Sequence, residues 1–278
     1  MKEKNKFFVI ATPIGNLQEI NPRIIASIEN CDYLFCEDTR ITQKLLNLIN
    51  IKKFPKLISY HKFNEKSKLE NLINLIQNHT CGLISDAGYP SISDPGQIII
   101  NSIRKQLPFY SVEVINCSNA IICALVGSGF NTSNFYFAGF LNRDNLDKEL
   151  ELLKNIKTTI VIYESVHRIQ NTLLTLDKHF PNKNLCVARE LTKQNETYYF
   201  GSGSEISKQL ILKGEFVIIL DNRDELYSKK IAINSNHISE VKELLNLNVR
   251  LKDACKFVAK KSNISNSELY KYFQNKKD

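Results

Sequence analysis

Residues 82–105 read GLISDAGYPSISDPGQIIINSIRK, and this stretch decides the fold expected for the first half of the chain. The apolar run at 82–85 predicts a β-strand, and the pattern from about 95 to 105 predicts a helix. Between them, the twelve residues 85–96 hold two aspartates, two glycines and two prolines. That density predicts a rigid binding loop, although an ordinary turn is the simpler alternative. Strand, loop and helix in this order are typical of a parallel α/β sheet.

The same alternation extends to both sides of this stretch. Asn21 is expected to cap a helix that has Pro22 at its first position, where the missing N–H of proline costs nothing. The pattern therefore predicts a parallel sheet with helices on both faces. The other strands of this sheet are expected at 7–12, 33–36, 57–60 and 112–115, with helices at 41–49 and 69–76.

The pattern changes after residue 119, and a mixed α+β domain is predicted there with some antiparallel strands. Strands are expected at 135–140, 159–163, 185–188, 197–200 and 216–220, and helices near 121–126, 146–155, 167–178 and 204–212. Three short amphipathic helices are expected at 237–247, 251–261 and 266–274. The predicted organisation is an N-terminal α/β domain (1–117), a C-terminal α/β domain (118–222), a linker (223–236) and a basic helical module (237–278).

Composition narrows the class of protein. A hydrophobic content of 43% with 24% charged residues is typical of a globular protein. No apolar run approaches the roughly 20 residues of a membrane helix, and no signal peptide is recognisable, so a soluble cytoplasmic protein is expected. The seven cysteines form no C-x-x-C pair, which predicts neither a disulfide framework nor a metal site.

The positive charge is concentrated at the end of the chain. The net charge is +8, and residues 229–278 hold eleven basic and five acidic residues. Lys252, Lys256 and Lys260 recur every four residues, which places them on one face of a helix. A localised basic surface predicts a polyanionic partner such as RNA, although a solvated lysine face remains the alternative.

Polar clusters follow the predicted strands at 12–16, 37–40, 59–61 and 85–96. Ligands of parallel sheets bind beyond the carboxyl ends of the strands, so these loops are expected to converge on one crevice. The second half adds clusters at 163–168, 188–193 and 213–216. No phosphate loop and no G-x-G-x-x-G after a strand is present, which disfavours a nucleotide hydrolase or an ordinary dinucleotide enzyme.

Six of these motifs closely resemble the ribosomal RNA small-subunit methyltransferase I family. They are TPIGNL (12–17), EDTR (37–40), SDAGYPSISDPG (85–96), YESVHRI (163–169), ARELTK (188–193) and GEF (214–216). The resemblance implies the two-domain tetrapyrrole methylase-like (class III) fold, with S-adenosylmethionine in the cleft between the domains. It also implies 2′-O-methylation of a cytidine in the decoding centre of 16S rRNA, within the small ribosomal subunit, and a possible homodimer.

Matching the motifs residue by residue implies the cofactor contacts. They are Pro13, Gly15, Asp86, Ala87, Gly88, Tyr89, Ser118, Asn119, Tyr163, Ala188 and Gly214. The chain departs from the family at 116–120, where Asn-Cys-Ser-Asn-Ala replaces a Pro-Gly-Pro-Ser-Ala type of turn. If the replaced glycine had a positive φ, Cys117 would be strained by about 1 kcal/mol and cofactor binding would weaken.

The general base is left open among several residues expected to line the cleft. The candidates are Glu37, Asp38, His61, Glu164, Glu190 and Lys193. Arg40, Arg168 and Arg189 are candidates for RNA phosphate contacts, as are Lys252, Lys256 and Lys260; structural salt bridges are the alternative for the arginines.

Two other functions remain open. A tetrapyrrole methyltransferase of the same fold would act on a small molecule, and neither the basic tail nor EDTR would be expected in it. A non-enzymatic nucleic-acid-binding protein would leave the loops at 12–16 and 85–96 without a role.

Overall fold

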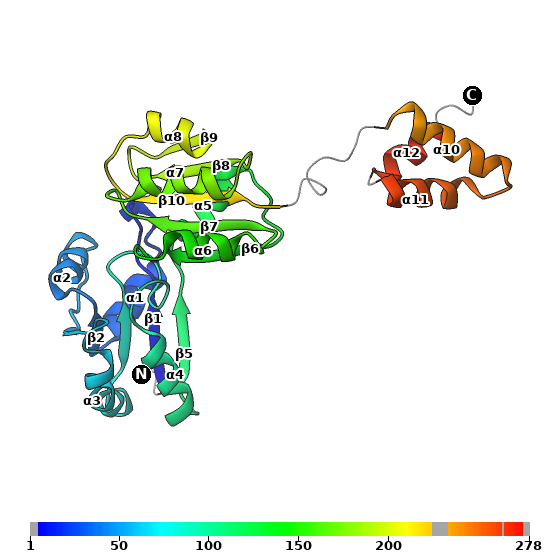
Figure 1. The fold of residues 1–278 in the computed structure, drawn as a ribbon. Coiled ribbons are helices and arrows are strands. Elements are labelled where there is room, and N and C mark those ends of the chain that lie inside the picture. The colour runs from blue at the N-terminus through cyan, green and yellow to red at the C-terminus, as the bar shows by residue number, and fades with distance from the viewer. Residues whose placement is uncertain (1–4, 224–232, 263, 275–278) are drawn as a thin grey trace. The chain divides into compact units, whose positions relative to one another are not determined.

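The computed structural model describes residues 5–223, 233–262 and 264–274 (Figure 1). The chain forms two compact units, Met1–Asp221 and Asn222–Asp278. Each is described by itself below. Within the described ranges, no helix combines the length and the apolar character needed to cross a bilayer.

The first half of the larger unit is a parallel five-stranded sheet, as predicted. Its strands are β1 (Lys6–Ile10), β2 (Tyr33–Cys36), β3 (Lys56–Ser59), β4 (Cys81–Ile84) and β5 (Ser111–Ile115), in the order β3-β2-β4-β1-β5. All neighbouring strands are parallel. The connecting helices are α1 (Pro22–Asn30), α2 (Thr39–Leu48), α3 (Glu65–Asn78) and α4 (Gln97–Gln106), with a short 3-10 helix η1 (Leu17–Glu19) before α1.

Helices cover both faces of this sheet because successive strand side chains point to opposite sides. Phe7 and Val9 of β1 pack with residues of α3 and α4. Phe8 and Ile10 pack with residues of α1 and α2 on the other face. Asn21 caps α1 as predicted, since its side chain accepts a hydrogen bond from the Ile24 amide.

The second half is a mixed sheet of β6 (Phe135–Phe140), β7 (Thr159–Glu164), β8 (Leu185–Arg189), β9 (Thr197–Gly201) and β10 (Phe216–Asp221). The order is β6-β7-β10-β8-β9. Only the β6–β7 pair is parallel; the others are antiparallel, which confirms the mixed character predicted from the sequence. The helices are α5 (Ala120–Ser128), α6 (Leu146–Leu153), α7 (Ile169–His179) and α8 (Gly203–Gln209).

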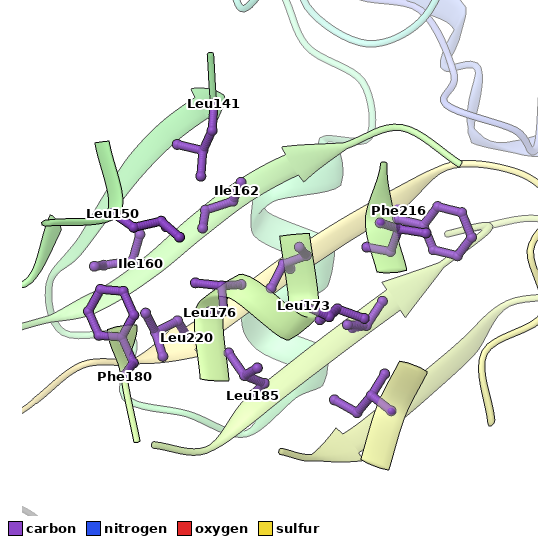
Figure 2. Packing of buried hydrophobic residues seen from close by; sticks show 14 of the residues in the cluster. Leu141, Leu150, Ile160, Ile162, Leu173, Leu176, Phe180, Leu185, Phe216 and Leu220 are labelled. Carbon is purple, nitrogen blue, oxygen red and sulfur yellow. The ribbon is translucent and has the colours of Figure 1, made fainter. Parts of the chain in front are cut away.

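One face of the second sheet carries the larger core. Leu173 and Leu176 of α7 point toward Ile160 and Ile162 of β7 and Leu220 of β10 (Figure 2). The other face is covered by α5, and Ile14 from the loop after β1 joins that cluster. A loop of the first half therefore packs into the second half, which fixes the two sheets at the site described below.

The smaller unit is a three-helix module with its own core around Val241, Val258 and Leu269. Its helices are α10 (Ser235–Asn246), α11 (Leu251–Ser262) and α12 (Asn266–Gln274). The start of α10 lies two residues before the predicted one, because Asn234 and His237 form a capping box. Most of the predicted linker, 224–232, lies outside the described residues.

Candidate functional site

The larger unit contains a cavity of about 510 Å³ between its two sheets, a size typical of small-molecule sites. The first half contributes the loops after β1 and β4, and the second half contributes the end of β6, the start of α5, the loop after β7 and the loop before β10. The lining residues are Ile14, Ala87, Gly88, Tyr89, Ile92, Ser93, Asp94, Asn119, Ala120, Phe140, Tyr163, Glu164, Ser165, Val166, His167, Gly214, Glu215, Phe216 and Val217.

The loop at 85–96 is held in one conformation by its own hydrogen bonds. Thr12 and Gly88 form an antiparallel bridge, with N···O distances of 2.9 and 3.1 Å. The Ser85 hydroxyl donates to the Gly88 carbonyl at 2.9 Å. Ser91 and Ser93 both have a positive φ, at 68° and 66°. Such left-handed serines are uncommon and cluster at functional sites, where the surrounding structure maintains them.

Asp94 is the carboxylate that this loop presents to the cavity. Burial, together with the negative charge of Glu37, raises the pKa of Asp94 to about 6. The cation of Lys62 acts in the opposite direction. Asp94 was not among the sequence candidates, although it is the second aspartate of the motif that defined the loop.

Two other carboxylates line the cavity but are already engaged. Glu164 is buried; it accepts hydrogen bonds from the Ser165 amide at 2.7 Å and from the Thr172 hydroxyl at 2.6 Å. Glu215 is exposed and pairs with Lys193 at 2.9 Å. Neither is as available for proton transfer as Asp94.

Lys193 forms two ion pairs beside the cavity, both with glutamates of its own half. Its ammonium lies 2.8 Å from Glu190 and 2.9 Å from Glu215. Burial alone would lower the pKa of Lys193, but the hydrogen bonds to Glu190 and Glu215 outweigh it and raise the pKa. The hydrogen bond from Lys193 in turn lowers the pKa of Glu190. This pairing argues against the predicted base roles of Lys193 and Glu190, because a base must be unprotonated and free to accept.

Two glycines are required by this arrangement. A Cβ at Gly15 would collide with the Lys193 stem, so the loop after β1 can approach it only as glycine. Gly214 has φ +97°, and a Cβ there would collide with the Glu190 carboxyl group. The Glu190–Lys193–Glu215 cluster therefore depends on bare backbone from both halves.

The remaining sequence candidates for the base lie outside the cavity lining. Asp38 caps α2 by accepting from the Arg40 amide, and its carboxylate pairs with the Arg40 guanidinium at 2.6 Å. That hydrogen bond lowers the pKa of Asp38 to about 2. The His61 ring lies 3.0 Å from the Asn64 amide nitrogen and does not reach the cavity. Glu37 acts through its charge on Asp94.

The arginines predicted to bind phosphate have different surroundings. Arg40 is exposed at the surface. Arg189 is only 4% exposed, and its guanidinium donates to the carbonyls of Lys213 and Asn195, so a structural role replaces the predicted phosphate contact. Arg168 donates to the Leu141 carbonyl at 2.9 Å and lies 3.6 Å from Glu164. This bonding supports the structural alternative for Arg168 as well.

Six of the predicted cofactor contacts line the cavity: Ala87, Gly88, Tyr89, Asn119, Tyr163 and Gly214. The other five are not among the lining residues: Pro13, Gly15, Asp86, Ser118 and Ala188. Among them, Asp86 accepts from the Asp38 amide at 3.3 Å, and Ser118 donates to Glu19 at 2.6 Å. Besides Asp94, motif matching missed lining residues such as Ile92, Phe140 and His167, although Ile92 and His167 stand inside the quoted motifs.

The strain considered for Cys117 is absent, because this residue does not have a positive φ. The Tyr89 hydroxyl donates to the Cys117 carbonyl at 3.2 Å and accepts from its amide at 3.3 Å. The turn at 116–120 is thereby anchored to the 85–96 loop, with no backbone penalty for the cysteine.

Comparisons with known proteins agree with this geometry. Residues 6–207 match the family model described as Tetrapyrrole (Corrin/Porphyrin) Methylases. A ribosomal RNA small subunit methyltransferase I from Mycoplasma pneumoniae is 42% identical over 95% of this chain and 97% of its own length. Its namesake from Bacillus subtilis is 33% identical over 95% of this chain and 92% of its own length.

Solved structures show the same fold at low identity. Uroporphyrin-III-C-methyltransferase from Thermus thermophilus has a TM-score of 0.55 at 14% identity and covers 81% of this chain and 98% of its own. Diphthine synthase has a TM-score of 0.58 at 9% identity and covers 77% of this chain and 89% of its own.

Gly214→Ala is expected to destabilise the larger unit more than Gly129→Ala. Both positions have a positive φ, which costs an alanine about 1 kcal/mol. Only the alanine at 214 also collides with Glu190, and overpacking costs about 1–3 kcal/mol more. Urea unfolding of the two variants measures the difference, and equal losses would show that Glu190 moves aside freely.

Proposed function

Because the chain belongs to the ribosomal RNA small subunit methyltransferase I family, we propose that it transfers a methyl group from S-adenosylmethionine to the ribose 2′-hydroxyl of a cytidine in 16S rRNA. The similarity spans nearly the full length of the relatives. Four of the six motifs, at 12–17, 85–96, 163–169 and 214–216, also contribute residues to the lining of one cavity. This convergence is the observation that supports the function most strongly.

The cavity lining suits S-adenosylmethionine. Apolar side chains such as Ile92, Phe140 and Val166 provide surface for an adenine ring. The negative charges that act on Asp94 favour a cationic sulfonium and ammonium. Ala87, Gly88, Tyr89, Asn119, Tyr163 and Gly214 would hold the cofactor. Bound there, it supplies a methyl group to the ribose oxygen as the carbon–sulfur bond breaks.

Asp94 is the residue that we assign as the general base. Its carboxylate lines the cavity and is less engaged than those of Glu164 and Glu215. A base with a pKa of about 6 is ionised at neutral pH and still accepts a proton more readily than an ordinary aspartate. The proton of the 2′-hydroxyl would pass to Asp94 while the oxygen bonds to the methyl carbon. The rigid 85–96 loop would keep the carboxylate in place for this step.

The rival functions are less consistent with the findings. The tetrapyrrole enzymes share the fold at 14% identity or less, whereas the rRNA methyltransferases are 33–43% identical. A non-enzymatic binder would not need the cavity. We also propose that the substrate is 16S rRNA within the small subunit, that the enzyme acts in the cytoplasm, and that it forms a homodimer like the family that it resembles.

The three-helix module is proposed to contact RNA phosphates through α11. Lys252, Lys256 and Lys260 are all exposed, whereas Ala254 and Val258 are buried on the inner face of the helix. Lys261 is excluded from this set because it pairs with Glu240. Phosphate contacts of this kind position an RNA without reading its sequence.

The reaction is tested by incubating the purified protein with labelled S-adenosylmethionine and small subunits from a strain that lacks the enzyme. We expect one ribose-methylated cytidine in 16S rRNA, located by mass spectrometry of its fragments. Intact cofactor binding without label on the rRNA would contradict the proposed substrate.

Asp94→Asn is expected to lower kcat by about 10²-fold or more, since a general base contributes 10²–10⁴-fold. In the unaltered enzyme, kcat should fall as the pH drops through about 6, because protonated Asp94 cannot accept a proton. Glu215→Gln serves as the control because Glu215 is another carboxylate of the lining, and it is exposed. This variant should show the same fall of kcat at low pH as the unaltered enzyme. If kcat of Asp94→Asn still falls as the pH drops through about 6, the base is a group other than Asp94.

Lys256→Ala/Lys260→Ala is expected to raise KM for small subunits and to weaken its dependence on salt. Each lost phosphate contact lowers the slope of log K against log salt by about 0.7–0.9. Lys148→Ala/Lys208→Ala removes the same charge from the larger unit and serves as the control. The measurement is KM for small subunits across a series of salt concentrations. Equal slopes of log KM against log salt for the two double variants would exclude α11 as a phosphate-binding helix.

A further inference from the structure

Phe63 is 97% exposed, the highest value for a large hydrophobic side chain among the described residues. It lies in the loop between β3 and α3, within the sequence Tyr60-His61-Lys62-Phe63-Asn64. Complete exposure of a phenylalanine ring has a cost in water that the fold does not recover. The ring therefore has no role in the packing of this unit.

The loop that carries Phe63 is held in place by several hydrogen bonds. The Asn64 side chain accepts from the His61 amide at 2.9 Å and donates to the Ser59 carbonyl at 3.3 Å. The Asn64 amide donates back to the His61 carbonyl at 2.9 Å. Lys68 also donates to the Ser59 carbonyl, at 2.8 Å. These bonds fix the backbone on both sides of Phe63, so its exposure is not the result of a loose loop.

The neighbouring ring helps to orient Phe63. The His61 imidazole lies edge-on to it, with ring centroids 6.1 Å apart and planes at 64°. The His61 imidazole is itself held by the side-chain amide nitrogen of Asn64. His61, one of the candidate bases, therefore helps to orient the exposed ring of Phe63.

Phe63 also lies in a loop at the carboxyl ends of the parallel strands, as do the first-half loops that line the cavity. The loop follows the carboxyl end of β3, and the loops after β2 and β4 leave the same edge of the sheet. Lys62, the preceding residue, is close enough to Asp94 to lower its pKa. The exposed ring therefore follows directly in the chain after a cation whose charge acts on the cavity-lining carboxylate.

We propose that Phe63 stacks on an unpaired nucleobase of the rRNA substrate, at or next to the nucleotide whose ribose is methylated. This inference rests on the proposed function. Access to a single ribose requires RNA whose bases are splayed out, and aromatic side chains replace the stacking that such bases lose. Every base offers a π-face, so one exposed ring suffices.

The surroundings favour RNA over a protein partner. Lys62 and Lys66, on either side of Phe63 in the sequence, are both exposed. A single ring among cations matches a base next to its phosphate backbone. It is a poor match for the apolar centre of a protein interface, where charged residues are depleted.

The test compares Phe63→Ala with Phe109→Ala. Phe109 is 89% exposed, but it lies between α4 and β5, at the opposite edge of the same sheet. Labelling of small subunits gives kcat/KM, and titration with S-adenosylmethionine gives Kd. We expect Phe63→Ala to lower kcat/KM by about 5- to 150-fold, the equivalent of losing one stacked base, and to leave Kd unchanged. Phe63→Tyr should keep nearly full activity, and Phe109→Ala should behave as the unaltered enzyme.

Equal kcat/KM values for Phe63→Ala and Phe109→Ala would overturn the inference. So would a loss in Phe63→Ala that is accompanied by a change in sedimentation, because the ring would then contact a second copy of the chain. Melting curves of all variants should coincide, since both rings are exposed. Failure of the unaltered enzyme to label any rRNA would instead refute the proposed function, which keeps the two failures distinguishable.

Discussion

β1 lies between β4 and β5 in a sheet whose strands all run parallel, and the site depends on this pairing. Parallel strands release their loops at one edge, so the loop after β1 meets the loop after β4 there. The Thr12–Gly88 bridge joins the two loops directly. Because both are fastened to the central strands, Asp94 is presented on a rigid support and a bound ligand need not order it.

Beside the cavity, the backbone of two glycines packs directly against charged side chains of the second half. Gly15 and Gly214 leave room for the Lys193 stem and the Glu190 carboxyl group. Glu190 itself has φ +52°, an uncommon conformation for a residue with a side chain. The ion pairs with Lys193 help to maintain it. The cluster therefore stabilises the surface of the second half against which Gly15 packs, and its ion pairs argue against a base role for Glu190 and Lys193.

The fold could be predicted because apolar periodicity and the placement of glycine and proline are local properties of the sequence. The engagement of individual side chains in hydrogen bonds and ion pairs could not be predicted, because it depends on how separate elements and loops pack. Glu164 is engaged by Thr172, and Arg189 by the carbonyl of Lys213, 24 residues away. The raised pKa of Asp94 depends on burial and on Glu37, which belongs to another strand end. Motifs thus locate the cavity but do not separate structural from reactive residues.

The charges around the cavity constrain how RNA can be recognised there. The negative charge of Glu37 raises the pKa of both Asp86 and Asp94, and this concentration of negative charge favours a cationic cofactor but repels phosphates. Attraction of the polyanion then has to come from elsewhere, and the exposed lysines of α11 are the cations that we propose for it. Stacking on an uncharged ring such as Phe63 is insensitive to that repulsion. An aromatic contact is therefore the physically favoured means of holding a nucleotide beside an acidic centre.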